Sequence, residues 1–145
     1  FTLMFPWDAF IQGLLVTIAV LTILTGAFGA LTKRHLVKSL AWLIVCHVGF
    51  MLAGLATHNQ AAIAGAIFYM AHDMLVKTGL FLFAGISYRL LATHVYSKAG
   101  GLMTNHPGWS LLFAIPLFSV VGIPPLSGFW PKIALLSGMR EAGQW

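Results

Sequence analysis

Residues 66–86 form an apolar run long enough to cross a membrane, and this run carries Asp73 and Lys77 near its middle. A charged side chain at bilayer depth costs about 2.5–3.5 kcal/mol on insertion scales. On a helix the two residues are four apart and share one face, in the order that favours an ion pair. A chain that keeps both charges needs them, either as a static pair that fixes helix packing or as part of a transport pathway.

The composition excludes a soluble globular domain. Hydrophobic residues make up 59% of the 145 residues and charged residues only 8%, against roughly 25% charged in soluble domains. The net charge of +5 does not indicate nucleic-acid binding, because the basic residues cluster beside apolar runs. Cys46 is the one cysteine, so neither a disulfide framework nor a thiolate metal cluster is expected.

Four apolar blocks predict an all-α polytopic membrane bundle with about four transmembrane helices. The blocks are residues 10–30, 39–56, 61–91 and 109–139. The third is long for one span, so it must tilt, project from the bilayer or contain an irregularity near Thr78 and Gly79. We interpret residues 1–145 as a single transmembrane region and, since the chain begins at Phe1, as an internal piece of a longer protein.

The last of these helices is expected to be discontinuous. The fourth block is interrupted by the helix-breaking residues Gly122, Pro124, Pro125 and Gly128. Proline cannot donate a backbone hydrogen bond and clashes with the preceding turn, so two half-helices joined by a non-helical link are predicted. Such a link is tolerated at membrane depth only where protein or a water-filled cavity surrounds it.

Two lysines are the strongest candidates for a role in ion transport. Burial favours the neutral amine of Lys77 and the neighbouring carboxylate favours the charged form, so this lysine can change protonation when an ion or proton arrives. Lys132 follows the break, near the positive end of the second half-helix, where we expect its proton to be loosely held. The alternative for Lys132 is a side chain that reaches outward to the membrane interface.

Three further side chains are candidates for the surroundings of this pair. Tyr69 falls on the stripe of Asp73 and is expected to hydrogen-bond into a polar chain. His47, in the second block, is either a proton relay or a satisfied core residue. His72 lies about 100° from Asp73 and about 140° from Lys77 on an ideal helix, so it is expected to face a neighbouring helix or another protein of an assembly. No histidine or carboxylate set has metal-ligand spacing, and no cofactor site is predicted.

The basic residues also predict the topology. They lie in two connections, Lys33, Arg34 and Lys38 in the first and Arg89 and Lys98 in the second. With four crossings, both connections fall on one side of the membrane, whereas Asp8, Arg140 and Glu141 on the other side nearly cancel. The positive-inside rule therefore places residues 33–38 and 89–98 of this multi-pass protein in the cytoplasm.

Three segments resemble a known family. Residues 67–85 (IFYMAHDMLVKTGLFLFAG) and 121–132 (VGIPPLSGFWPK) resemble the antiporter-like subunits shared by Mrp cation/proton antiporters and respiratory complex I. Residues 38–55 (KSLAWLIVCHVGFMLAGL) also look like a span of these subunits, with His47 where glutamine is frequent. Complex I relatives tend to carry histidines at the positions of Tyr69 and Asp73, so the closer resemblance is to the D subunits of Mrp antiporters.

The resemblance implies a subunit of a large hetero-oligomeric membrane assembly that exchanges sodium for protons, a transporter component and not an enzyme. Lys77 matches the family's lysine on the central polar axis, and Lys132 matches the terminal lysine of the broken helix. Two alternatives remain open from the sequence. One is a proton-pumping subunit in the membrane arm of a complex I-like NADH–quinone oxidoreductase or a membrane-bound hydrogenase, and the other is a structural scaffold.

Overall fold

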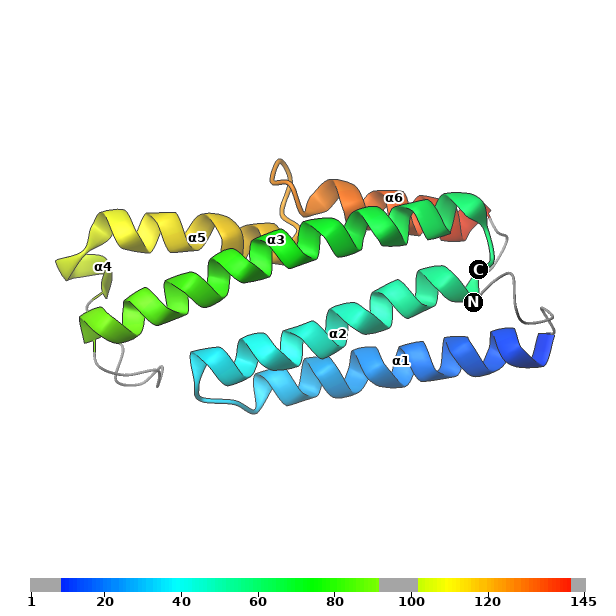
Figure 1. Cartoon of the computed structure of the whole chain (residues 1–145), viewed down its shortest axis with the longest axis horizontal. Helices are drawn as coiled ribbons and strands as arrows, with labels where there is room; N and C mark the ends of the chain where they lie inside the picture. Colours follow the sequence, from blue (N-terminus) through cyan, green and yellow to red (C-terminus); the bar gives the residue numbers. More distant parts are fainter. Residues whose placement is uncertain (1–8, 92–101, 142–145) are drawn as a thin grey trace.

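The computed structural model describes residues 9–91 and 102–141, which fold into helices joined by short connections (Figure 1). In chain order these helices are α1 (Ala9–Leu31), α2 (Leu36–Ala56), α3 (Gln60–Leu91), α4 (Leu102–Asn105), α5 (Pro107–Val121) and α6 (Phe129–Glu141). The described ranges contain no strand. The prediction of an all-α membrane bundle is confirmed.

Three helices are long and apolar enough to cross a membrane, namely α1, α2 and residues 60–90 of α3. The first two form an antiparallel hairpin, and α3 lies against α2 (Figure 1). Helices α5 and α6 follow one another along α3 and together take the place of the predicted fourth span. The α5–α6 arrangement also confirms that the last helix is discontinuous.

Helix α3 is continuous for 32 residues, so the irregularity considered near Thr78 and Gly79 is not formed. At 1.5 Å per residue a helix of this length extends over roughly 48 Å, against about 30 Å of hydrocarbon. A tilt or a projection beyond the bilayer therefore remains to account for its length. The continuity matters for the site, because it keeps the residues in the middle of α3 on fixed helical faces.

Helix α5 ends at a glycine, which is a common way for a helix to end. Gly122 has a left-handed backbone conformation (φ 84°), and its N–H donates to the carbonyl oxygens of Phe118 and Ser119. Glycine adopts this conformation without the steric cost that a side chain brings, which explains its place at the end of a helix. The prolines at positions 124 and 125 then prevent the helix from resuming until Phe129.

Small residues let α3 and α6 approach closely. A methyl group added at Gly65 of α3 would lie 2.9 Å from backbone atoms of Leu135, and one added at Gly138 of α6 would lie 2.5 Å from the backbone nitrogen of Ala62. Close backbone approach at glycine and alanine is a common way for helices to associate in lipid, where apolar burial gives little driving force. This packing fixes α6, and with it Lys132, relative to α3.

The α1–α2 turn, with Lys33 and Arg34, lies at the same end of the bundle as the C-terminal end of α3, whose last turn contains Arg89 (Figure 1). Lys33 and Arg34 precede α2, whereas Lys38 belongs to its first turn, because α2 starts three residues earlier than predicted. Lys98 and Asp8 lie outside the described residues, as does most of the connector after α3. The side of the membrane on which this end lies stays a prediction.

The glycine packing predicts a difference between two substitutions on α3. We expect Gly65→Ala to destabilise the full-length protein by about 1–3 kcal/mol, because the new methyl group forces α6 away from α3. Gly79→Ala is the matched control, since a methyl group there meets nothing within 4 Å and alanine favours a helix by up to about 1 kcal/mol. Thermal unfolding in detergent measures both, and equal melting temperatures would contradict the packing described.

Candidate functional site

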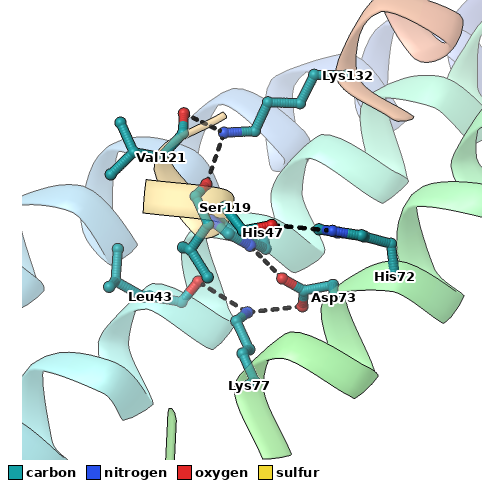
Figure 2. A network of polar contacts seen from close by, with 9 residues as sticks. Leu43, His47, His72, Asp73, Lys77, Ser119, Val121 and Lys132 are labelled. Carbon is teal, nitrogen blue, oxygen red and sulfur yellow. Dashed lines mark hydrogen bonds and ion pairs between the residues drawn. The ribbon is translucent and has the colours of Figure 1, made fainter. Parts of the chain in front are cut away.

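A buried ionic cluster joins the middle of α2 to the middle of α3 (Figure 2). The carboxylate of Asp73 contacts two groups at once, with one oxygen hydrogen-bonded to Nδ1 of His47 and the other 2.7 Å from Nζ of Lys77. Lys77 also donates a 3.3 Å hydrogen bond to the carbonyl oxygen of Leu43 on α2. Asp73, Lys77 and His47 are 7%, 6% and 5% exposed. Each oxygen of the carboxylate therefore faces a group that can carry a proton.

The sequence determines only part of this cluster. The spacing of four residues on a continuous helix brings Lys77 to Asp73, as expected from the sequence. His47 is 26 positions away and reaches Asp73 only because α2 packs on α3 at that level. The three side chains can hold a variable number of protons around a single carboxylate.

Tyr69 does not extend this cluster by a hydrogen bond, contrary to the expectation from its stripe. Its ring packs against α2, with its centroid 5.6 Å from that of His47 and 6.5 Å from that of Phe50. The side chain is 2% exposed, and within the described residues its hydroxyl group has no hydrogen-bond partner. Aromatic packing against α2 thus fixes the ring and leaves the hydroxyl group unsatisfied.

Lys132 lies at the break and binds the end of α5. Its Nζ donates hydrogen bonds of 2.8 and 2.9 Å to the carbonyl oxygens of Val120 and Val121, the last two residues of that helix. The final carbonyls of a helix have no partner within it, and they carry the negative end of its dipole. The preceding two carbonyls are satisfied by backbone N–H groups after the helix. Lys132 therefore completes the cap of α5.

The ammonium group of Lys132 does not stay at the positive end of α6, the position assumed for it from the sequence, and the expectation that its proton is loosely held stays a prediction. The side chain leaves the first turn of α6 and ends at the negative end of α5, where a charged donor is favoured. It also does not extend to the membrane interface, the alternative considered from the sequence. Sequence reasoning missed this contact because nothing in the pattern of residues 121–132 fixes the angle between the two half-helices.

His72 joins α3 to the break through the hydroxyl groups of Ser119, which Figure 2 labels, and Ser127. Its Nε2 lies 3.0 Å from Oγ of Ser127 in the link and 3.3 Å from Oγ of Ser119 in the last turn of α5. The two hydroxyl oxygens are 2.9 Å apart, so the three groups form a triangle of polar contacts. His72 faces a neighbouring helix, as expected, but Ser119 and Ser127 had no signal in the sequence that set them apart from other serines.

The ionic cluster and the break enclose a gap that is too narrow for a water molecule. It is lined by His47, Tyr69, His72, Asp73, Ser119, Val120, Gly128 and Lys132. The opposite face of the cluster is open, because a groove of about 590 Å³ between α2 and α3 reaches Asp73 and Lys77. Its other walls are mainly apolar, with Ile44, Val48, Met51, Met70, Met74, Phe81 and Leu82.

Residues 9–91 and 102–141 contain no group of three or more histidine, cysteine or acidic side chains placed to hold a metal ion. Cys46 is buried and unpaired in α2. The polar groups of the site are instead a carboxylate, two ammonium groups, two imidazoles and hydroxyl groups. Such a set can bind, hold and release protons.

Comparison with known proteins points to one family. The membrane domain described as "NADH:quinone oxidoreductase/Mrp antiporter, TM" matches residues 1–145. The chain is 44% identical to the D subunit of the Na(+)/H(+) antiporter of Alkalihalophilus pseudofirmus, over 94% of this chain and 28% of that protein. It is 40% identical to the D subunit of the Na(+)/H(+) antiporter of Bacillus subtilis, over 100% of this chain and 30% of that protein.

The chain thus spans less than a third of the length of the relatives it matches. Within that length the family match includes both the ionic cluster and Lys132, since it extends through all of α3 and α6. The fold is a membrane helix bundle with a broken last helix, and the family match covers the whole chain. The chain therefore belongs to the membrane-domain family shared by NADH:quinone oxidoreductases and Mrp antiporters, and it is similar to the D subunits of the antiporters.

Proposed function

We propose that this chain is the proton-translocating part of a subunit of a multisubunit Na⁺/H⁺ antiporter, in which protons pass along buried lysines. The observation that carries the proposal is the Asp73 carboxylate, held between the ammonium group of Lys77 and the imidazole of His47. An ion pair at this depth is costly unless its geometry is good and its other hydrogen bonds are made. Both conditions are met here, so the cluster can persist while its protonation changes.

Lys132 is the second station of the proposed pathway. Discontinuous helices with unwound backbone at mid-membrane are a recurring device for binding coupling ions in secondary transporters. Here the break brings the carbonyl oxygens of Val120 and Val121 to the ammonium group. Loss of the Lys132 proton would weaken the cap of α5, so protonation at this position is coupled to the geometry of the break.

The relatives named as Na(+)/H(+) antiporter subunits support the antiporter over a redox-driven pump. The family description also names NADH:quinone oxidoreductases, so membership in the membrane arm of a redox enzyme is the second candidate. Tyr69 and Asp73, at positions where complex I relatives tend to carry histidines, favour the antiporter. Isolation of the native assembly separates the two, because flavin or iron–sulfur subunits accompany only the redox enzyme.

Partners and location follow from the same proposal. The other subunits of the antiporter are the expected protein partners, and protons and sodium ions are the expected cargo, within a bacterial inner membrane. Large apolar side chains are exposed along α1, including Phe10, Leu21 and Phe28, which fits a face covered by lipid or by neighbouring helices. The connections at residues 33–38 and 89–98 are expected on the cytoplasmic side.

Substitution of Lys77 tests the first station. We expect Lys77→Ala in the complete assembly to lower sodium-dependent proton transport in liposomes by at least about tenfold, because the pathway loses a group that carries the proton. Lys38→Ala is the matched control, since it removes a lysine from the first turn of α2, away from the ionic cluster. If Lys77→Ala transported as well as the wild type, the proposed function would be wrong.

The Lys77→Met variant addresses the scaffold alternative, because methionine fills a similar volume without a charge. A scaffold would tolerate this change with both assembly and transport intact, as buried ion pairs often can be replaced by apolar groups. We expect the variant to assemble and to lose transport. Size-exclusion chromatography and the liposome assay report the two properties separately.

Substitution of Lys132 tests both its cap on α5 and its proposed role in proton transport. Lys132→Met leaves the carbonyl oxygens of Val120 and Val121 without this donor, and the loss at the part-buried Val120 carbonyl costs about 1–3 kcal/mol. Lys132→Gln keeps N–H donors but cannot carry a proton in this way. We therefore expect both variants to lose transport and only Lys132→Met to lose much thermal stability. Full transport by Lys132→Gln would exclude a proton-carrying role for this lysine.

A further inference from the structure

We propose that the groove at the basic end of the α1–α2 hairpin binds an anionic phospholipid, with the phosphate at Lys33 and Arg34 and an acyl chain between the helices. The inference goes beyond the proposed function, because it holds whether or not this chain moves protons. Neither the family description nor the names of the relatives assign a lipid to these residues. The shape of the groove, its charge and its depth each support the proposal.

The groove lies between the end of α1 and the first half of α2. Its volume is about 510 Å³, which is in the range of sites for small molecules. Lys33 and Ser39 are its polar lining residues, and the other walls are apolar, formed by Ala27, Ala30, Leu31, Leu43 and Cys46. From Ser39 to Cys46 the groove follows α2 for roughly 10 Å, at 1.5 Å per residue. A charged end and an apolar trough together match the amphipathic form of a phospholipid.

Lys33 holds a positive charge at the edge of this groove. Its Nζ lies 5.6 Å from the centre of the Trp42 ring, so the ammonium group is placed over an indole in the second turn of α2. The ring is itself closely packed, since a methyl group added at Gly29 would lie 2.2 Å from it. A lysine near the end of a span ordinarily extends its ammonium group away from the bilayer. The contact with Trp42 keeps this one beside the groove.

No carboxylate compensates the charge of the turn. The chain has three acidic residues, which are Asp8, Asp73 and Glu141. Helices α1 and α2 and the turn between them therefore contain none, and both salt bridges within the described residues involve Asp73. Lys33 and Arg34 thus present two adjacent cations without an anionic partner from the described helices. Basic clusters of this kind at the end of a membrane span attract anionic lipid headgroups.

The turn lies at the depth of the lipid headgroups. Helix α1 is apolar over 23 residues, roughly 34 Å in length, which is enough to cross a hydrocarbon layer of about 30 Å. The basic turn follows shortly after its end. The hydroxyl group of Ser39 fixes this turn, because it donates to the carbonyl oxygens of Ala30 at 3.2 Å and Lys33 at 3.4 Å. A phospholipid has its phosphate directly beyond its acyl chains, in the order that the turn and the groove provide.

Thermal unfolding of the purified full-length protein in detergent tests the lipid. We expect phosphatidylglycerol to raise the melting temperature by at least about 2 °C, because a ligand of the folded state stabilises it. Phosphatidylcholine supplies acyl chains without net charge, and inorganic phosphate supplies charge without chains. Both are therefore expected to give less than half of this shift. No shift with phosphatidylglycerol, or an equal shift with either of the other two, would overturn the proposal.

Charge substitutions locate the phosphate. Titration with phosphatidylglycerol gives an apparent affinity, which we expect Lys33→Gln and Arg34→Gln each to weaken about fivefold, as for other cations at a membrane surface. Lys38→Gln is the matched control, because it removes the same charge from the first turn of α2 at a residue that does not line the groove. Its effect should stay below twofold. Equal losses in all three variants would indicate a general attraction of charge and reject the site.

Ala27→Phe tests the groove itself, because it fills the space between the helices and leaves both cations in place. We expect this variant to lose the shift with phosphatidylglycerol, and a full shift would contradict an acyl chain in the groove. If Lys33→Gln or Ala27→Phe does not purify, Arg34→Gln decides, and an unchanged affinity then overturns the proposal. Failure of these tests would leave the proposed function untouched, since none of them measures transport.

Discussion

The rest of the site depends on the carboxylate of Asp73. Its two oxygens contact Lys77 of the same helix and His47 of another, so one side chain links α2 to α3. A lone carboxylate in an apolar bundle would be too costly to keep charged, and so would a lone ammonium group. The ion pair between them keeps two ionisable groups at the centre of the described helices.

The last turn of α5 connects this cluster to the break. Its final carbonyls are bound by Lys132 from the far side of the break, and its Ser119 is bound by His72 from α3. Proline at positions 124 and 125 ends the helix at membrane depth, and the ammonium group replaces the hydrogen bonds that the missing turn would have made. Pro124 and Pro125 thus leave the last carbonyl oxygens of α5 without backbone donors, and Lys132 supplies the donor instead.

The sequence predicted what depends on local spacing. Runs of apolar residues determine the spans, prolines determine the break, and the spacing of four determines the Asp73–Lys77 pair, since these follow from helix geometry alone. The contacts of His47, His72 and Lys132 depend on helices that meet from distant parts of the chain. The rotation of each helix about its axis is set by packing, such as the glycine contacts between α3 and α6, and a single sequence does not contain it.

The two faces of the ionic cluster differ in a way that bears on transport. The groove between α2 and α3 leaves Asp73 and Lys77 reachable from one face, whereas the gap toward Lys132 is closed to water. Under the proposed function, proton exchange between the ionic cluster and Lys132 therefore requires a side chain or a helix end to move. The link after α5 is the natural place for such movement, because its backbone has left the regular hydrogen bonding of the helices on either side. The gap and the link thus form one structural unit, in which the side chains of His72 and Lys132 hold the end of α5.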